Sequence, residues 1–444
     1  MNSNKITFGS VFTIGLMLFA LFLGAGNMIF PPLLGQQAGD SSWIAIAGFL
    51  LTGVGLPLLG VIAIAKSGGS PLDLASRVHP IFGIIFTIIL YLAIGPFFGI
   101  PRTATVSYEI GVLPFLAQES AGGWSLLLFS ILFFTVTAWL SLNPAKLVDR
   151  IGKLLTPVLV VILAVLVGGA FINPMGEPGQ ASGGYVDSPF ITGFLEGYLT
   201  LDAIAALVFA IVIISAIQSK GVSDRKQIVK AVTMAGMIAA TGLAAVYISL
   251  SYLGATSLHA IGTQNNGGAL LSSSANYLYG PSGAIILGIA IGAACLTTSI
   301  GLVSAASSYF SKTFQKVSYK KFVLFFSIFS MLVANIGLAQ LIAVSVPVLV
   351  MIYPMTIVLI CMAFLDGLVK GKRSVYIGAI IPTFILGVSD GLAAAGFTAV
   401  ASAFSFLPLM DQSLGWIIPA LVGGIIGMLI PSSSRSAASA NYSN

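Results

Sequence analysis

Charged residues are scarce in this chain of 444 residues. Only 7% of the residues are Asp, Glu, Lys or Arg and 57% are hydrophobic, whereas about 25% of the residues in soluble globular proteins are charged. So few charges cannot solvate the surface of a water-soluble protein of this length, because an apolar exterior needs an apolar solvent. The composition excludes a soluble fold and predicts an integral membrane protein.

Cysteine and histidine are also rare, with two residues of each. Cys295 and Cys361 both fall in apolar runs, so they predict neither a disulfide framework nor a cysteine-based metal site. The letters Gly-Val-Ser-Asp-Gly at 387–391 match a nucleophile elbow, but that motif requires a strand, a turn and a histidine partner. His79 and His259 fall on opposite sides of the membrane in the topology that the basic residues indicate. We therefore expect no enzyme activity and no cofactor.

Long apolar runs fill most of the chain. A run of about 17 to 25 apolar residues is long enough to cross a membrane as a helix, and we count twelve such spans. They cover approximately 8–35, 42–65, 80–101, 124–141, 153–172, 189–217, 229–254, 283–310, 322–338, 341–365, 374–391 and 414–431. The alternation that marks membrane-spanning strands is absent. The predicted fold class is therefore an all-α integral membrane protein with twelve transmembrane helices.

The basic residues indicate which side each loop faces, because cytoplasmic loops are enriched in Lys and Arg. With twelve spans, eighteen of the nineteen fall on one side: Lys5, Lys66, Arg77, Lys146, Arg150, Lys153, Lys220, Arg225, Lys226, Lys230, Lys312, Lys316, Lys320, Lys321, Lys370, Lys372, Arg373 and Arg435. One span more or fewer in the middle of the chain would destroy this agreement, so both termini are expected in the cytoplasm. The basic residues form no patch with interleaved aromatics, and no nucleic-acid partner is expected.

The first span contains two glycines and an asparagine near its middle, Gly24, Gly26 and Asn27. Glycine is a poor helix former, and backbone groups freed within the membrane cost several kcal/mol each unless something binds them. A break at this depth indicates an ion or substrate site. The alternative is a notch for close helix packing, but packing alone does not need the polar side chain of Asn27.

The sixth span contains Glu196, Thr200 and Asp202. An acid within the membrane is costly and by default indicates function. Glu196 is near the outer end, where it can simply be solvated, whereas Asp202 lies deeper. We expect Asp202 to couple transport to a cation, either as a ligand or as a protonatable group. The alternative is that Asp202 is a structural partner of Arg102.

Arg102 is the one basic residue outside the cytoplasmic set, and two prolines disturb the span before it. An arginine at this place can simply extend its head group to the interface. We prefer a residue of an outer gate that forms a charge pair with Glu109 or with Glu196.

The eighth span contains three successive hydroxyl side chains, Thr297, Thr298 and Ser299. Hydroxyls in a helix can bond to the preceding turn, which is the structural explanation. They can also act as ligands of a hard alkali cation, which prefers oxygen, together with carbonyl groups freed in the first span. The residues alone do not decide between these two explanations.

The first and sixth spans both break near the middle, and this spacing is typical of an inverted repeat of five plus five helices. The repeats would cover 8–172 and 189–365 of a single transmembrane domain, 1–444. Two additional helices, 374–431, and a cytoplasmic tail, 432–444, would follow.

Three motifs then suggest a family. They are Gly24-Ala25-Gly26-Asn27 running into Phe30-Pro31-Pro32, the stretch from Gly95-Pro96-Phe97-Phe98-Gly99-Ile100-Pro101-Arg102 to Tyr108-Glu109, and Asn143-Pro144 with Lys146. These residues resemble the bacterial branched-chain amino acid transporters of the BrnQ (LIVCS) family, and the similarity covers the whole chain. The broken first span is shared more widely with sodium-coupled transporters of the LeuT-like fold. The resemblance implies a symporter in the bacterial cytoplasmic membrane that imports leucine, isoleucine and valine with sodium.

The resemblance also implies binding residues. Sodium, the one metal ion expected, would be held by the carbonyls of Ala20, Leu23 and Ala294 and the hydroxyls of Thr297 and Thr298. The substrate carboxylate would lie on the N–H groups around Gly24, Ala25 and Gly26, where the positive end of a half-helix faces it. The remaining substrate-site residues would be Asn27, Thr200, Asp202, Ala203 and Ile204. A second sodium site of the LeuT-like group would involve Asn27 and Thr200. This chain departs from that pattern, because Phe22 stands where a small residue is usual and Asp202 stands where the group is normally uncharged.

Two other functions compete with sodium symport. The chain could transport another small apolar amino acid with protons, or it could be a channel. Two dissimilar broken helices in the two halves of one chain favour alternating access over a channel, because channels often repeat one pore segment around an axis. The remaining partner expected is membrane lipid, and the sequence does not indicate an oligomeric state.

Overall fold

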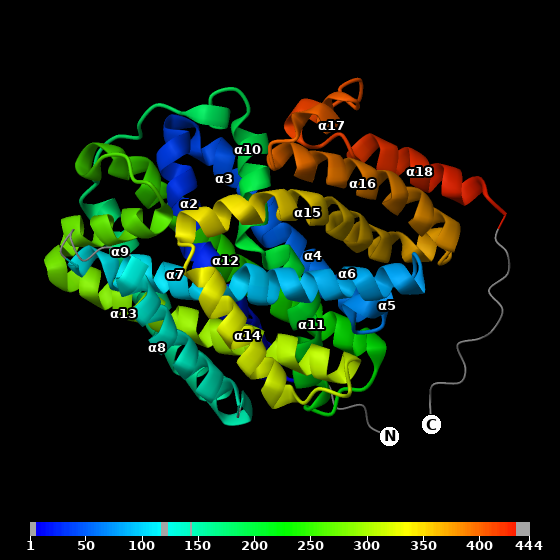
Figure 1. Ribbon diagram of the computed structural model, residues 1–444, viewed down its shortest axis with the longest axis horizontal. Coiled ribbons are helices and arrows are strands. Elements are labelled where there is room, and N and C mark those ends of the chain that lie inside the picture. Colours follow the sequence, from blue (N-terminus) through cyan, green and yellow to red (C-terminus); the bar gives the residue numbers. More distant parts are fainter. Residues whose placement is uncertain (1–5, 117–122, 143, 432–444) are drawn as a thin grey trace. The chain divides into compact units, whose positions relative to one another are not determined.

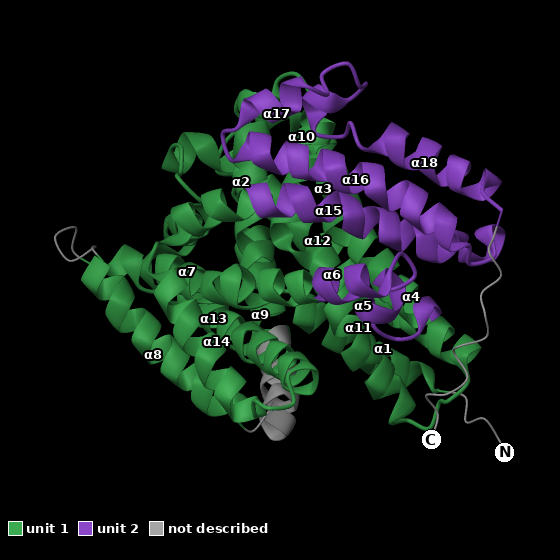
Figure 2. Cartoon of the chain, turned by 45° about the vertical axis from the view of Figure 1, so that its right-hand side comes forward, with its two compact units in different colours: residues 1–65, 88–346 green, residues 66–87, 347–444 purple. Residues whose placement is uncertain are grey.

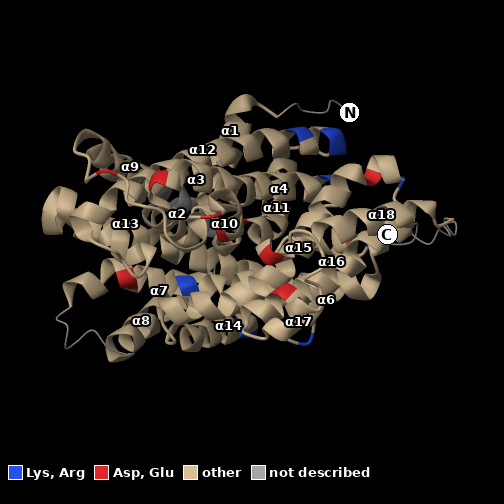
Figure 3. Ribbon diagram, turned by 90° about the horizontal axis from the view of Figure 1, so that it is seen from above, with Lys and Arg blue, Asp and Glu red and all other residues tan. Residues whose placement is uncertain are grey.

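The computed structural model describes residues 6–116, 123–142 and 144–431, and all regular structure in these residues is helical (Figure 1). The expected cytoplasmic tail, 432–444, lies outside the described residues, as does Lys5. Charged residues are sparse along the helices (Figure 3). The all-helical prediction is therefore confirmed for the part of the chain that is described.

The chain divides into two compact units (Figure 2). Unit 1 consists of residues 1–65 and 88–346, and unit 2 consists of residues 66–87 and 347–444. The helices of unit 1 are α1 (Phe8–Phe22), α2 (Ala25–Ala38), α3 (Ser42–Leu50), α7 (Gly99–Gly111), α8 (Gly123–Ser141), α9 (Pro144–Ile172), α10 (Pro189–Glu196), α11 (Asp202–Gln218), α12 (Arg225–Ile261), α13 (Gly267–Thr313) and α14 (Tyr319–Ala334). Unit 2 contains α5 (Pro71–Ala75), α16 (Arg373–Ala394), α17 (Thr398–Ser402) and α18 (Ile417–Leu429). Three helices run from one unit into the other: α4 (Leu56–Ser67), α6 (Pro80–Leu92) and α15 (Leu338–Val369).

Short 3-10 and π segments connect or interrupt these helices. The 3-10 segments are η1 (Gly39–Ser41), η4 (Leu113–Phe115), η6 (Gly183–Tyr185), η7 (Gly197–Thr200) and η8 (Met410–Gln412), and the π segments are η2 (Leu51–Gly55) and η3 (Ala93–Phe97). A π segment within a helix often marks a functional position. In η3 the backbone leaves the helical region at Gly95, and Pro96 offers no N–H to the helix. This interruption separates α6 from α7, the helix that carries Arg102.

Each of the twelve predicted spans overlaps one helix or consecutive helices, with different bounds. Among the described residues, seven helical stretches are long and apolar enough to cross a membrane, and an eighth is a pair bent by 42°. The seven are Ala25–Ser67, Pro80–Phe115, Gly123–Ser141, Arg225–Ile261, Gly267–Thr313, Leu338–Val369 and Arg373–Ala394. The bent pair joins Pro189–Thr200 to Asp202–Gln218, and three shorter apolar helices are Phe8–Phe22, Pro157–Ile172 and Ile417–Leu429. The chain therefore has several candidate membrane spans.

The first and sixth predicted spans are broken, as their sequences indicate. α1 ends at Phe22 and α2 begins at Ala25, with Gly24 in an extended conformation between them. In the sixth span, α10 and η7 are separated from α11 by Leu201, whose φ of 67° lies in the left-handed region. This conformation is rare for a leucine and is typical of functional sites, where the surrounding structure enforces it.

Within unit 2, an ion pair fixes the segment before α6. Arg77 lies 2.6 Å from the Asp366 carboxylate of α15, and it donates to the Tyr376 hydroxyl of α16 at 3.0 Å. The Tyr376 hydroxyl in turn donates to Asp366 at 2.8 Å. Burial alone would lower the pKa of Arg77, but the carboxylate and the tyrosine outweigh it and raise this pKa above its usual value. The guanidinium therefore stays charged and holds the segment to α15 and α16.

Within unit 1, glycines bring α2 and α12 together. Gly35 of α2 faces the backbone of Ser251, and Gly254 of α12 faces the backbone of Pro32. A Cβ on either glycine would overlap the opposite main chain. Small residues at such contacts let helices pack closely within a membrane. The two contacts hold the second half of the first broken helix against α12.

We expect Gly35→Ala and Gly254→Ala each to lower the stability of the folded protein by about 1–3 kcal/mol, because the added methyl group has no room. The measurement is the melting temperature of the purified protein in detergent. Gly292→Ala in α13 is the matched control, since no atom lies within 4 Å of a Cβ built there. Equal melting temperatures for all three variants would contradict the close contact.

Candidate functional site

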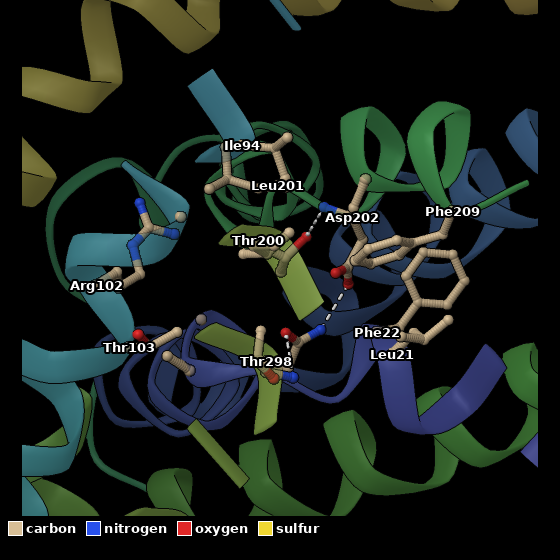
Figure 4. A pocket seen from close by; sticks show the side chains of 17 residues that line it. Leu21, Phe22, Ile94, Arg102, Thr103, Thr200, Leu201, Asp202, Phe209 and Thr298 are labelled. Carbon is tan, nitrogen blue, oxygen red and sulfur yellow. Dashed lines mark hydrogen bonds between the residues drawn. The ribbon is translucent and has the colours of Figure 1, made fainter. Parts of the chain in front are cut away.

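A pocket lies in unit 1 where the two broken helices meet (Figure 4). Its walls come from the α1–α2 break, from η3 and α7, from the η7–α11 break and from α13. The residues that line it are Leu21, Phe22, Gly24, Ala25, Gly26, Asn27, Ile94, Gly99, Arg102, Thr103, Thr200, Leu201, Asp202, Ala205, Phe209, Thr298 and Leu302. The structure therefore brings together residues of three predicted spans that the sequence singled out separately.

Asp202 is the centre of a buried hydrogen-bond network. Its Oδ2 atom accepts from Asn27 Nδ2 at 2.6 Å and from the Tyr247 hydroxyl at 2.6 Å. Asn27 Nδ2 also donates to the Tyr247 hydroxyl. Exposure is 2% for Asn27, 2% for Asp202 and 0% for Tyr247. A carboxylate at this depth is stabilised by its donors, and each hydrogen bond to a charged group is worth about 1.5–3 kcal/mol.

The backbone around the second break also supports the carboxylate. Thr200 Oγ1 donates to the Gly197 carbonyl at 2.9 Å and accepts from the Asp202 N–H at 3.2 Å. Asp202 is the first residue of α11, where the positive end of the helix dipole favours a negative charge. The left-handed Leu201 is what turns the chain into this position.

Asn27 caps α2, and its capping bond uses one of the N–H groups that were expected to bind the substrate carboxylate. Its Oδ1 atom accepts the Gly24 N–H at 3.1 Å, and this N–H also approaches the Phe22 carbonyl at 2.6 Å. The N–H of Gly24 is therefore engaged within the protein. The first-turn N–H groups of α2 that follow it belong to Ala25 and Gly26, and helix geometry leaves such groups without a partner in their own helix.

Arg102 points into the same region from α7 and is 2% exposed. Its Nη1 atom donates to the Leu199 carbonyl in the second break, and Nη2 lies 3.4 Å from Ser345 Oγ. Its guanidinium stacks over the Phe30 ring of α2, 5.2 Å from the centroid. It also acts electrostatically on Asp202. Arg102 thus contacts both broken helices.

The three residues of the predicted gate each interact with a residue outside the gate. Glu109 accepts from Asn266 at 3.4 Å, and Glu196 acts electrostatically on Tyr185. The contacts described for Arg102 are with the two broken helices and with Ser345. None of these contacts joins two of the three residues, so the gate pair stays a prediction.

The hydroxyls of α13 behave differently from one another. Thr297 Oγ1 donates to the Ala293 carbonyl at 2.9 Å, which is the back-bonded arrangement. Thr298 instead lines the pocket beside the first break, where a Cβ built on Gly24 would lie 3.5 Å from Thr298 Oγ1. The structure therefore places Thr298, but not the hydroxyl of Thr297, toward the α1–α2 break.

Carbonyl groups are also available at that break. Ala20 lies in the last turn of α1 and Leu23 is its C-cap, so their carbonyls belong to the helix end that lacks intrahelical partners. Ala294 lies one turn before Thr298 in α13. These are the oxygens expected for sodium.

Two of the expected substrate residues are buried but do not line the pocket. Ala203 and Ile204 are both 0% exposed but do not line it, whereas Ala205 and Phe209 do. Because α11 begins at Asp202, the residues three and seven positions later share its face of the helix. The apolar wall is therefore formed by Ala205 and Phe209 and not by the residues directly after the carboxylate.

Tyr247 is a functional candidate that the sequence reading missed. A tyrosine in an apolar span usually belongs to the core, and nothing nearby in the chain indicates a partner. Its one distinguishing signal is a hydroxyl group in the middle of the seventh span, where it needs a hydrogen-bond partner. The partner, Asp202, lies 45 residues earlier in the chain.

Solved transporters share this fold. The structure resembles that of Mhp1, a nucleobase-cation-symport-1 family transporter in a closed conformation with bromovinylhydantoin bound, with a TM-score of 0.63, 16% identity, and coverage of 97% of this chain and 95% of that chain. It also resembles MhsT in complex with L-phenylalanine, with a TM-score of 0.51, 18% identity, and coverage of 94% and 98%. The chain is thus an all-helical membrane protein with the LeuT-like fold.

Sequence comparison then gives the family. Residues 8–434 match the family described as branched-chain amino acid transport protein. The chain is 52% identical to the branched-chain amino acid permease BraB of Bacillus subtilis, over 94% of each chain. It is 48% identical to the branched-chain amino acid transport system 2 carrier protein of Pseudomonas aeruginosa, again over 94% of each. The chain belongs to this family, and it is a multi-pass membrane transporter and not an enzyme.

We predict that a cysteine at position 205 reacts with a small water-soluble thiol reagent several-fold faster than one at position 203. The reason is that Ala205 lines the pocket and Ala203 faces the neighbouring helices. The measurement uses Ala205→Cys and Ala203→Cys in proteoliposomes, with Cys295→Ala and Cys361→Ser as background. Both cysteines should react alike after denaturation, and faster labelling at 203 in the native protein would contradict the orientation of α11.

Proposed function

We propose that the chain is a secondary active symporter that imports leucine, isoleucine and valine, coupled to sodium by alternating access. Membership of the family and the names of the relatives support the substrate class. The observation that carries the proposal is the pocket in which two broken helices meet at one buried carboxylate, Asp202. Broken helices of this kind form substrate and ion sites in secondary transporters.

The proposed topology has twelve spans, with both termini in the cytoplasm and the chain in the bacterial cytoplasmic membrane. Residues 8–172 and 189–365 form the two inverted repeats, and residues 374–431 supply two additional helices. The overlap of each predicted span with one or more helices supports this arrangement, as does the loop distribution of basic residues.

The proposed substrate site lies between the N-terminus of α2 and the apolar wall of the pocket. The α-carboxylate is placed at the N–H groups of Ala25 and Gly26, where the helix dipole favours an anion. The branched side chain is placed against Phe22, Ala205 and Phe209, which line the same pocket. Such a wall offers few hydrogen bonds, so a charged side chain would lie there desolvated.

The proposed sodium site lies beside the first break. Its ligands are the carbonyls of Ala20, Leu23 and Ala294 and the hydroxyl of Thr298, with Thr297 as a candidate that would first have to release Ala293. These are neutral oxygens, which suit an alkali cation. Asp202 is proposed as the charged element of coupling, because its charge must be balanced differently in the outward-facing and inward-facing states.

A proton-coupled transporter is the second candidate, and Asp202 favours it. A buried carboxylate held by two neutral donors can exchange a proton during the cycle without any metal ion. The two candidates differ in the driving gradient and not in the pocket.

Uptake of labelled leucine into proteoliposomes with imposed sodium or proton gradients tests the proposal. We expect a sodium gradient to drive accumulation, with isoleucine and valine competing and lysine and glutamate not competing. Accumulation driven by protons alone would select the second candidate. Leucine flux that never exceeds equilibrium under either gradient would contradict symport.

We expect Thr298→Ala to raise the half-saturating sodium concentration of uptake while leaving leucine half-saturation nearly unchanged, because it removes an ion ligand and leaves the α2 N-terminus in place. Thr297→Ala should have a smaller effect, since its hydroxyl would first have to release the Ala293 carbonyl. A larger effect of Thr297→Ala, or no effect of Thr298→Ala, would remove Thr298 from the site.

We expect Asp202→Asn to reduce gradient-driven accumulation to near equilibrium while exchange of leucine between equal pools persists, since the change keeps the shape and removes the charge. Asp390→Asn is a matched control, because Asp390 is also a buried acid, 4% exposed, and lies in unit 2. Normal accumulation in a well-expressed Asp202→Asn protein would exclude the coupling role. If Asp202 is instead a structural partner of Arg102, the single variant should lose yield and the double variant with Arg102→Gln should regain it.

A further inference from the structure

Tyr247 contacts the site from a helix other than the two broken ones. It belongs to α12, a continuous helix of 37 residues, and its side chain is 0% exposed. Its ring meets the Phe49 ring edge-on, at a centroid distance of 5.4 Å and an interplanar angle of 83°. This contact fixes the ring, so the hydroxyl is delivered to one place, the carboxylate of Asp202.

The hydroxyl connects the two breaks. It donates to Asp202 of the second break and accepts from Asn27 of the first break. Asn27 also donates to Asp202, so the three groups form a closed triangle of hydrogen bonds. A phenol has a single proton, and here this proton is directed at the carboxylate. The arrangement therefore favours one orientation of the carboxylate relative to both helices.

The two donors of the triangle bind the same oxygen. Asn27 and Tyr247 both donate to Oδ2 of Asp202, so neither of them occupies Oδ1. Asp202 also lines the pocket, whereas Tyr247 does not. Tyr247 therefore acts on the pocket through residues that line it, Asp202 and Asn27.

We infer that Tyr247 is a positioning residue of the coupling step: it orients Asp202 against the first broken helix and so sets the affinity for the driving cation. This inference rests on the proposed function, in which Asp202 is the charged element of coupling. Removing the hydroxyl takes away one of the two donors that hold the carboxylate, so the cation must pay the cost of ordering it when it binds. The substrate wall is unaffected, because Tyr247 is not part of it.

The test is Tyr247→Phe, which keeps the ring and its contact with Phe49. We expect the half-saturating concentration of the driving cation to rise about tenfold, as the loss of one hydrogen bond to a charged group predicts. Leucine half-saturation at saturating cation should stay within twofold or so of the parent value, which is small on the same scale. Tyr353→Phe is the matched control, a tyrosine of unit 2 that is also 0% exposed.

A double-variant cycle separates positioning from a general structural role. In the Asp202→Asn background, where leucine exchange persists, adding Tyr247→Phe should not change the cation dependence of this exchange further, because the group that Tyr247 orients has lost its charge. If Tyr247→Phe changes the cation dependence by the same factor in the parent protein and in Asp202→Asn, the inference is overturned. An unchanged cation dependence in Tyr247→Phe itself would also overturn it.

A second substitution keeps the test informative if Tyr247→Phe folds poorly. A para-aminophenylalanine at position 247 retains a donor at the same place, and it should restore cation dependence toward the parent value. A half-saturating cation concentration that stays as high as in Tyr247→Phe despite this donor would overturn the inference. Normal coupling in Asp202→Asn would instead refute the proposed role of Asp202, and this outcome is distinct from a failure confined to Tyr247.

Discussion

The carboxylate of Asp202 is the group on which the arrangement of the site depends. A charged acid away from water is costly unless donors surround it, and here Asn27 and Tyr247 supply them from two other helices. Satisfying this one group requires a break in the first span, a break in the sixth and a hydroxyl on α12 at the same point. Both helix interruptions thus serve to place hydrogen-bonding groups around the Asp202 carboxylate.

The packing around the site keeps these three helices in register. Glycines at positions 35 and 254 let α2 and α12 approach closely, which sets the distance between Asn27 and Tyr247. Arg102 contacts both breaks, through the Leu199 carbonyl and through a stacking contact on α2. Polar contacts at the breaks and small residues between the helices therefore act together.

Much of this organisation could be predicted from the sequence, because apolar length and helix-breaking residues are local signals. The span positions, both breaks and Asp202 itself were of this kind. The role of Tyr247 could not be predicted, because it arises from a contact between distant segments. Ala203 and Ile204 remain predicted substrate residues. Ala205 lines the pocket instead of them, because the left-handed Leu201 starts α11 at Asp202 and so determines which face meets the pocket. That conformation is not visible in the composition of the segment.

The central claim is that binding of the driving cation changes the state of the Asp202 carboxylate. Infrared difference spectroscopy of the purified protein, with and without the driving cation, measures this directly. The account predicts a change in carboxyl absorption on cation binding that is absent from Asp202→Asn and kept in Asp390→Asn. A difference spectrum that is the same in the parent protein and in Asp202→Asn, under conditions where the cation drives uptake, would contradict it.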